Sequence, residues 1–151
     1  MSYKHLHLPF VNVYVDGTFH NGMYGGGYVV YSPDGDIIYQ DCGIGKNDPE
    51  LLAMRNIAGE MTAAMRATNW LYKNNLTGII VHDYNGLAYW AKREWKRNNK
   101  FTQMYSDYMF PFYRDGIINF EWVKGHTKVE GNEIADRLAK QSVICNQSWK
   151  F

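Results

Sequence analysis

Four acidic residues have positions from which a sheet and its helices could bring their carboxylates together. Asp16 and Asp83 each follow a short apolar run that is typical of a strand, so we expect each at the tip of a strand. Glu60 lies within a predicted helix, and Asp136 lies in the first turn of another. If the two strands are neighbours, their aspartates lie close together, and like charges at that separation cannot both stay ionised cheaply without a cation.

A cluster of four carboxylates offers the hard oxygen ligands that suit Mg²⁺ or Mn²⁺. Each acid taken alone is also explained as a solvated strand end or as a charge near a helix N-terminus, where acids are common. Two acids at strand ends, a Glu after a Gly in an apolar helix face and an Asp in an early helical turn are difficult to obtain together by chance. The set as a whole therefore favours a divalent metal site.

The elements that must carry these acids follow in the order βββ-α-β-α-α-β-α. Hydrophobic periodicity and turn residues predict these elements: strands over 10–15, 27–31, 37–39, 79–83 and 117–123, and helices over about 49–73, from Asn85 through Arg97, from a Thr102 cap through Phe112, and from an Asn132 cap through Val143. Gly59 lies in the middle of the first helix and costs about 1 kcal/mol relative to Ala, which predicts a close backbone approach there. The pattern favours one α/β domain with a mixed sheet.

Length and composition limit the classes of protein that remain. A chain of 151 residues has the usual size of one domain, and we expect a single domain over 1–151 with its core at about 10–145. The net charge of +1 excludes a wholly cationic surface, so a polyanion site requires local clustering of Lys and Arg. Cys42 and Cys145 lack the spacing of a zinc site. The sequence has no leader-like start and no apolar run of about 18 residues, so we expect a cytoplasmic protein without membrane contact. We also expect a monomer.

The segment WAKREWKRNNK at 90–100 is the densest basic run, with five cations against Glu94 and with Trp90 and Trp95 among them. Lys and Arg contact phosphates, while aromatic faces pack against bases or sugars, so the run suits a nucleic-acid backbone. On composition alone, a solvated helix whose tryptophans face the core explains the run slightly better. We expect Trp90 to pack in the core in either case.

Four motifs of the chain resemble those of type I ribonucleases H in order and spacing. They are VDGTF at 15–19, RNIAGE at 55–60, VHDYNG at 81–86 and VKGHTKVEGNEIAD at 123–136. The resemblance extends from about Phe10 to Lys140, and its last motif is the most specific. It implies a ribonuclease H-like fold, in which a five-stranded mixed sheet, three antiparallel strands and then two parallel additions, is flanked by helices.

The resemblance also implies a chemistry, namely endonucleolytic hydrolysis of the RNA strand of RNA/DNA hybrids to 5′-phosphate and 3′-hydroxyl products. In the family, acids that match Asp16, Glu60, Asp83 and Asp136 hold two divalent ions, Mg²⁺ or Mn²⁺, about 4 Å apart. One ion activates the attacking water and the other stabilises the leaving oxygen. His126 matches the family's assisting histidine, whose imidazole titrates near neutrality and could pass a proton or loosen the product.

Discrimination of RNA from DNA requires contact with the 2′-hydroxyl of one strand. Many members of the family carry a basic protrusion after the motif that contains Asp83, and it grips the DNA strand; this resemblance favours nucleic-acid binding by the run at 90–100 over a solvated helix. The candidate substrate contacts are Gly17, Thr18, Asn56, Asn85, Lys92, Trp95, Lys96 and Arg97. Asn56 and Asn85 match positions where relatives place Asn or Gln in the minor groove, but Ile57 replaces a second polar residue. His82, beside Asp83, is expected to be a packed or exposed strand residue and is not among the candidates.

Two other functions are compatible with the same fold. A non-catalytic nucleic-acid-binding module would use the basic run alone, but the presence of all four acids argues against it. A DNA-directed nuclease would use the same acids, but the motif that runs from His126 to Asp136 argues against it. The host and the physiological hybrid stay open, and primer removal, R-loop clearance and a mobile-element role are all compatible with the sequence.

Overall fold

A five-stranded mixed sheet organises the chain. The computed structural model describes residues 10–125 and 129–150. The strands are β1 (Phe10–His20), β2 (Met23–Tyr31), β3 (Ile37–Ile44), β4 (Thr77–His82) and β5 (Ile118–Trp122), in the spatial order β3-β2-β1-β4-β5. The first three strands pair antiparallel, whereas β4 joins β1 and β5 joins β4 in parallel. The predicted five-stranded mixed sheet is confirmed, and the first and fourth strands, on whose adjacency the meeting of Asp16 and Asp83 depended, are neighbours.

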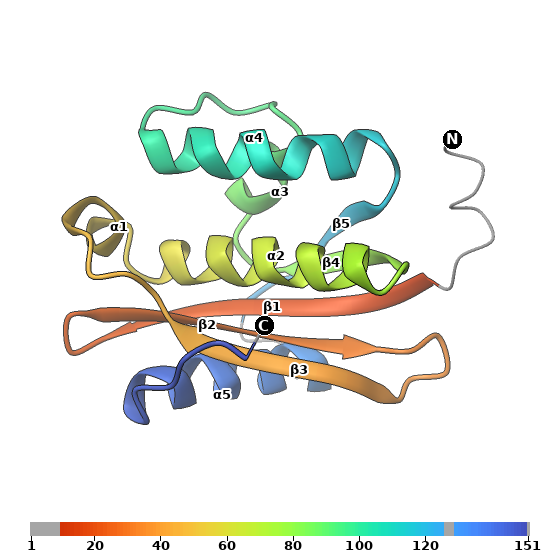
Figure 1. Cartoon of the computed structure of the whole chain (residues 1–151), viewed down its shortest axis with the longest axis horizontal. Helices are drawn as coiled ribbons and strands as arrows, with labels where there is room; N and C mark the ends of the chain where they lie inside the picture. Colours follow the sequence, from red (N-terminus) through yellow and green to blue (C-terminus); the bar gives the residue numbers. More distant parts are fainter. Residues whose placement is uncertain (1–9, 126–128, 151) are drawn as a thin grey trace.

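Helices cover both faces of this sheet (Figure 1). They are α1 (Pro49–Ala53), α2 (Asn56–Lys73), α3 (Gly86–Ala91), α4 (Lys100–Arg114) and α5 (Glu130–Ile144). Figure 1 shows α2 against one face with α3 and α4 beyond it, and α5 against the opposite face. None of the described helices has the length and apolar character needed to cross a membrane.

Residues of β1 alternate between the two faces, as side chains of a strand do. Val11, Val13 and Val15 are buried in the main core, which α2 helps to form. Tyr14 packs instead against the cluster that contains Leu138 of α5. The next residue that faces α5 is Asp16, so β1 directs this acid away from the main core.

Two glycines let α2 lie against the sheet without intervening side chains. A Cβ atom on Gly17 of β1 would collide with the backbone oxygen of Asn56, and one on Gly59 of α2 would collide with the backbone oxygen of Gly25. The close approach that Gly59 predicted is therefore confirmed. It brings Glu60, the next residue along α2, to the edge of β1.

The single helix predicted over 49–73 is wrong, because the structure divides it into α1 and α2. Met54 and Arg55 separate the two helices, and Arg55 has a left-handed φ of 55°. The local sequence contains no Gly or Pro at this point, so the break comes from packing. The Arg55 guanidinium lies over the Phe19 ring at 5.0 Å, while Leu51 of α1 packs with Tyr24.

The helix predicted from Asn85 through Arg97 is also wrong in its second half. α3 ends at Ala91, and Arg93 takes a left-handed φ of 64°. The indole of Trp95 folds back onto the ring of Tyr89, with centroids 5.0 Å apart, which a continuous helix would not allow. The basic run is therefore mostly a loop, which we call the basic loop (residues 92–99).

Two predicted helix caps differ by a few residues. Asn99 is the N-cap of α4, and Thr102 is its partner in a capping box, with each side chain accepting from the other's backbone N–H. α5 begins at Glu130, so Asn132 lies in its first turn and is not its cap. Thr102 and Asn132 both have the right chemistry for a cap, so residue type alone did not fix the cap position.

Candidate metal and nucleic-acid site

Asp16 lies within β1 and not at its tip, where we expected it. β1 continues to His20 in its ladder with β2, and Asp16 is opposite Gly27. On its other side, the parallel ladder with β4 ends at the pair Tyr14 and Val81. Asp16 therefore lies where β4 has ended and the edge of β1 is open, which is the functional equivalent of a strand end.

Three acids from three elements meet at this open edge. Asp83 directly follows β4, and Glu60 reaches the edge from α2. One carboxylate oxygen from each of Asp16, Glu60 and Asp83 lies within 4.8 Å of the others. Asp16 is 9% exposed and Glu60 is 1% exposed, so water does little to separate their charges. We call these three residues the acid cluster.

The acid cluster favours protonation when no cation is present. Burial raises the pKa of Asp16, and the neighbouring Asp83 carboxylate adds to the rise, which brings the pKa to about 8. A hydrogen bond from the Gly17 N–H at 2.9 Å opposes this rise but does not cancel it. Burial, followed by Asp83 and Asp16, raises the pKa of Glu60 well above its usual value. A hard divalent cation would compensate both causes, so the donor set fits Mg²⁺ or Mn²⁺.

Asp136 lies beside the acid cluster and is paired with a lysine. Asp136 comes from α5, on the opposite face of the sheet from α2, and its charge helps to raise the pKa of Asp16. Its Oδ2 accepts from the Lys140 Nζ, one helical turn later, at 2.9 Å. The Asp136 side chain is 43% exposed. It is near enough to join a metal site, provided that Lys140 releases it.

The predicted assisting histidine, His126, lies outside the described residues. Gly125, which precedes it, is described. A Cβ atom on Gly125 would lie 3.7 Å from the Asp83 Oδ2. Gly125, the last residue described before His126, therefore lies beside the acid cluster.

The candidate contacts for the RNA strand are placed around the cluster. Asn56 is the first residue of α2, Asn85 precedes α3, and both are exposed. Thr18 is partly exposed on β1 beyond Asp16. Gly17, by contrast, is already explained by its packing against α2, and only its backbone remains for a substrate.

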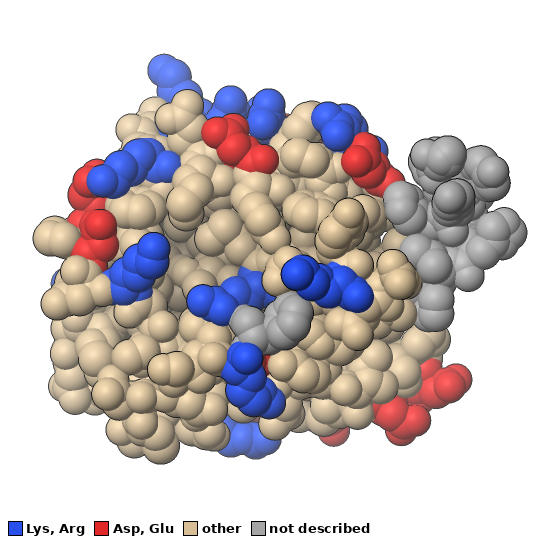
Figure 2. Space-filling view, in the orientation of Figure 1, with Lys and Arg blue, Asp and Glu red and all other residues tan. Residues whose placement is uncertain are grey.

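The basic loop presents its cations at the surface. The side chains of Lys96 and Arg97 are exposed, and that of Lys92 is partly exposed. Trp95 is 40% exposed and stacks on Tyr89, so one of its faces is held in place by packing. Figure 2 shows Lys and Arg side chains along the edge of the molecule above α4, to which the basic loop leads. Trp90 is partly buried against the main core, in line with our expectation.

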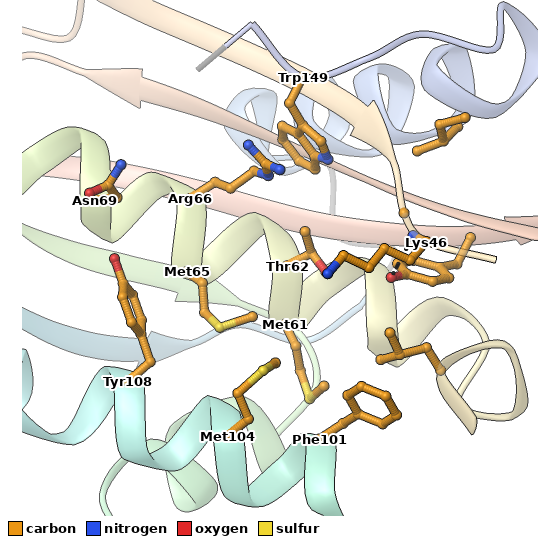
Figure 3. A pocket seen from close by; sticks show the side chains of 14 residues that line it. Lys46, Met61, Thr62, Met65, Arg66, Asn69, Phe101, Met104, Tyr108 and Trp149 are labelled. Atoms are coloured by element: carbon orange, nitrogen blue, oxygen red, sulfur yellow. Dashed lines mark hydrogen bonds between the residues drawn. The ribbon is translucent and has the colours of Figure 1, made fainter. Parts of the chain in front are cut away.

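A cavity of about 550 Å³ lies apart from these acids, between α2, α4 and the segment that follows α5. Met61, Met65 and Met104 point toward one another in it, and Arg66 lies beside Trp149 (Figure 3). Among the described residues that line it there is no Asp or Glu. The cavity therefore has no carboxylates with which to bind a divalent cation.

Sequence reasoning missed two side chains that touch the turn after β4. The Trp122 Nε1 donates to the Asp83 backbone oxygen at 2.9 Å, and the His82 Nδ1 lies 2.9 Å from the Tyr84 backbone oxygen. Trp122 could have been noticed because it directly precedes the motif that begins at Val123. His82 lies inside the motif VHDYNG, but a histidine in an apolar strand is compatible with many roles, so the motif did not indicate its contact with the turn.

Comparison with known proteins identifies relatives of the whole arrangement. The family model described as RNase H matches residues 9–144. A ribonuclease H of Rickettsia typhi is 33% identical over an alignment of 104 residues, and the match covers 60% of this chain and 66% of the relative. A ribonuclease H of Chromohalobacter salexigens is 28% identical over an alignment of 140 residues, and the match covers 87% of this chain and 83% of the relative.

Solved structures share the fold at lower identity. RNase H1 of the archaeon Halobacterium salinarum superposes with a TM-score of 0.74 at 18% identity, over 90% of this chain and 98% of that one. LC11-RNase H1, solved in complex with an RNA/DNA hybrid, superposes with a TM-score of 0.73 at 14% identity, over 90% and 98%. At these identities the likeness supports the fold alone.

Proposed function

Because the chain belongs to the RNase H family, we propose that it is an endonuclease that hydrolyses the RNA strand of RNA/DNA hybrids. The products would carry 5′-phosphate and 3′-hydroxyl ends. The observation that carries this proposal is the approach of Asp16, Glu60 and Asp83 to within 4.8 Å at the open edge of β1. The chain spans 66% of the length of the Rickettsia relative, slightly less than two thirds. The activity and the substrate are therefore proposals for this chain.

The acid cluster and Asp136 would hold two divalent ions, Mg²⁺ or Mn²⁺. Such ions, when bound, supply an activated water and stabilise the leaving oxygen of a phosphodiester. The chain's own contribution is to hold buried carboxylates close together. Burial and the neighbouring carboxylates make their ionisation unfavourable, and this raises the pKa of Asp16 and of Glu60. His126 would assist by moving a proton near the leaving group or by loosening the product.

The hybrid would lie across the acid cluster and the basic loop. Lys92, Lys96 and Arg97 would contact phosphates of the DNA strand, and the exposed face of Trp95 would pack against a sugar or base. Thr18, Asn56, Asn85 and the backbone of Gly17 would contact the RNA strand, where 2′-hydroxyls distinguish it. We further propose that the protein acts as a cytoplasmic monomer.

A cleavage assay with four labelled substrates tests this proposal. With Mg²⁺ or Mn²⁺, the RNA of an RNA/DNA hybrid should be degraded, while duplex DNA, duplex RNA and single-stranded RNA are spared. EDTA should stop the reaction. Equal cutting of hybrid and duplex DNA would favour the DNA-directed nuclease, and hybrid binding without cutting would favour the non-catalytic module.

Matched variants connect the activity to the acid cluster. Asp16→Asn keeps the size of the side chain but removes its charge, and it should lower turnover by about 10³-fold or more while leaving hybrid binding nearly unchanged. Asp34→Asn makes the same change at an exposed loop position and should keep full activity. Retained activity in Asp16→Asn would exclude the cluster as the catalytic centre.

A further inference from the structure

Asp83 lies on the short turn that connects β4 to α3. This turn has to keep the Asp83 carboxylate close to two other carboxylates. The Asp83 carboxylate lies within 4.8 Å of carboxylate oxygens of Asp16 and Glu60. Ionised carboxylates at that separation repel each other, so the position of Asp83 depends on the contacts that fix this turn. The side chains that fix this turn therefore bear on the metal site.

Trp122 supports the turn from the neighbouring strand. Trp122 is the partner of His82 in the ladder between β4 and β5. Its indole Nε1 donates to the Asp83 backbone oxygen at 2.9 Å. The ladder continues beyond it, because the Val123 N–H donates to the His82 backbone oxygen at 2.8 Å. Trp122 thus holds the backbone of the metal-site acid itself.

His82 supports the same turn from inside the sheet. Its Nδ1 is 2.9 Å from the Tyr84 backbone oxygen. A carbonyl oxygen only accepts, so this nitrogen carries the hydrogen. The His82 side chain is 1% exposed, and its ring packs edge-on against Phe120, with centroids 5.8 Å apart. Its orientation is therefore set by packing, and the hydrogen bond that it donates is fixed in direction.

The two bonds hold consecutive carbonyls of the turn, those of Asp83 and Tyr84. The Tyr84 N–H points to the Glu60 Oε2, at 3.5 Å, and so connects the turn to the cluster. We propose that Trp122 and His82 are positioning residues, whose ring N–H groups hold the β4–α3 turn so that the Asp83 carboxylate stays in its metal-binding position. This inference rests on the proposed metal-dependent function of the acid cluster.

Trp122 provides the cleaner test, because it is 53% exposed. Water can solvate the Asp83 carbonyl after Trp122→Phe, and the phenyl ring keeps most of the packing. The variant should unfold at nearly the wild-type temperature. A purely structural role predicts no other change, whereas a positioning role predicts weaker metal binding, since supporting partners of ligands typically contribute about 10- to 100-fold in metal affinity.

The experiment measures Mn²⁺ binding to the full chain without substrate, by titration calorimetry or by the loss of the free Mn²⁺ paramagnetic resonance signal. We expect Trp122→Phe to weaken binding about tenfold. Trp149→Phe is the matched control, because the Trp149 Nε1 has no hydrogen-bond partner among the described residues, and its Mn²⁺ affinity should equal that of the wild type. Wild-type affinity in Trp122→Phe would overturn the role of Trp122.

A pair of variants at His82 keeps the proposal testable if one of them folds poorly. His82→Asn places an amide N–H near the position of Nδ1 and should retain Mn²⁺ affinity, whereas His82→Leu removes the donor and should lower it. Equal Mn²⁺ affinities of two folded variants would overturn the role of His82. If the wild type binds Mn²⁺ and these differences appear, but no hybrid is cleaved, the proposed function fails while the positioning role stands.

Cleavage kinetics provide a second readout. In Trp122→Phe, the rate should fall at limiting Mn²⁺ and recover at saturating Mn²⁺, with the KM for the hybrid unchanged. A raised KM for the hybrid with normal Mn²⁺ dependence would instead place Trp122 in substrate binding and overturn the proposal.

Discussion

At Asp16, two physical effects act in the same direction on one carboxyl group. Burial at β1 and the charge of Asp83 both raise its pKa, while the Gly17 N–H only partly opposes them. In the unfolded chain neither effect is present, and the pKa of an aspartate is about 3.9. The folded protein without metal therefore holds a proton that the unfolded chain has released at neutral pH.

This difference makes the stability of the metal-free protein depend on pH with a defined sign. Because the folded state binds more protons between pH of about 4 and pH of about 8, the free energy of unfolding should fall as pH rises through that window. Asp16→Asn removes the titrating group, so its thermal midpoint in EDTA should exceed that of the wild type at pH of about 8, by roughly 3 °C for each kcal/mol.

Thermal unfolding in EDTA across this pH range measures the effect. Asp34→Asn serves as the control and should follow the wild-type curve, because Asp34 is exposed. The raised pKa of Asp16 would be contradicted by a wild-type thermal midpoint that rises with pH. It would also be contradicted if the midpoint of Asp16→Asn changed with pH in parallel with that of the wild type.

At the scale of elements, helix α2 shows packing overriding helix propensity. Gly59→Ala should favour the helix by about 1 kcal/mol on propensity alone. The new methyl group would collide with the backbone oxygen of Gly25 in β2. The collision could be relieved only if α2 moved away from the sheet. Overpacking of this kind costs about 1–3 kcal/mol or more, so we expect net destabilisation.

Denaturant unfolding gives the sign directly. Lys73→Ala changes an exposed residue of the same helix and should alter the free energy of unfolding by less than about 0.5 kcal/mol. Stabilisation by Gly59→Ala would mean that α2 does not lie as close to β2 as described. Since Glu60 follows Gly59, a shifted α2 should also weaken Mn²⁺ binding.

The basic loop should control how hybrid binding depends on salt. Replacing Lys92, Lys96 and Arg97 by Gln removes up to three phosphate contacts, each of which contributes about 0.7–0.9 to the slope of log affinity against log salt concentration. We therefore expect weaker binding and a flatter salt dependence, measured by fluorescence anisotropy with Asp16→Asn as background. Lys46→Gln with Lys73→Gln, outside the loop, should leave the slope unchanged.

At the scale of the whole molecule, the segment after α5 returns along β3 (Figure 1). The Ile44 N–H donates to the Gln147 backbone oxygen at 2.9 Å, and the Lys150 N–H donates to the buried Asp41 carboxylate at 3.1 Å. Trp149 stacks on Tyr28, with ring centroids 6.2 Å apart. The segment thereby covers part of the core next to β3, the edge strand of the sheet.

Trp149→Ala should consequently lower the free energy of unfolding by about 3 kcal/mol, within the range for a truncated aromatic residue. Cleavage by the folded fraction should persist at low temperature, because Trp149 contributes no ligand to the acid cluster. Unfolding curves and assays at two temperatures measure both effects. Loss of cleavage at a temperature where the variant is folded would connect this segment to the site.

Much of the fold and of the candidate site was predictable from local patterns. The order of the elements along the chain followed from hydrophobic periodicity and turn signals, and a close backbone approach of the first long helix followed from Gly59. Predictions were wrong where backbone conformation depends on distant partners. Arg55 and Arg93 take left-handed φ values of 55° and 64° although their neighbours have helical periodicity. Distant contacts accompany both breaks, since the Arg55 guanidinium lies over Phe19 and Trp95, just after Arg93, stacks on Tyr89.

The sequence by itself determined which acids are available and the order of the elements that carry them, since residue type and hydrophobic period are local properties. Only the tertiary structure decided that Asp16 lies within β1 and still meets Asp83, because that depends on the β1–β4 ladder ending at Tyr14, two residues before Asp16. It also decided that Trp122 and His82 hold the turn, since both hydrogen bonds depend on the packing of β5 against β4. Contacts between strands far apart in the chain are set by register, which no short motif records.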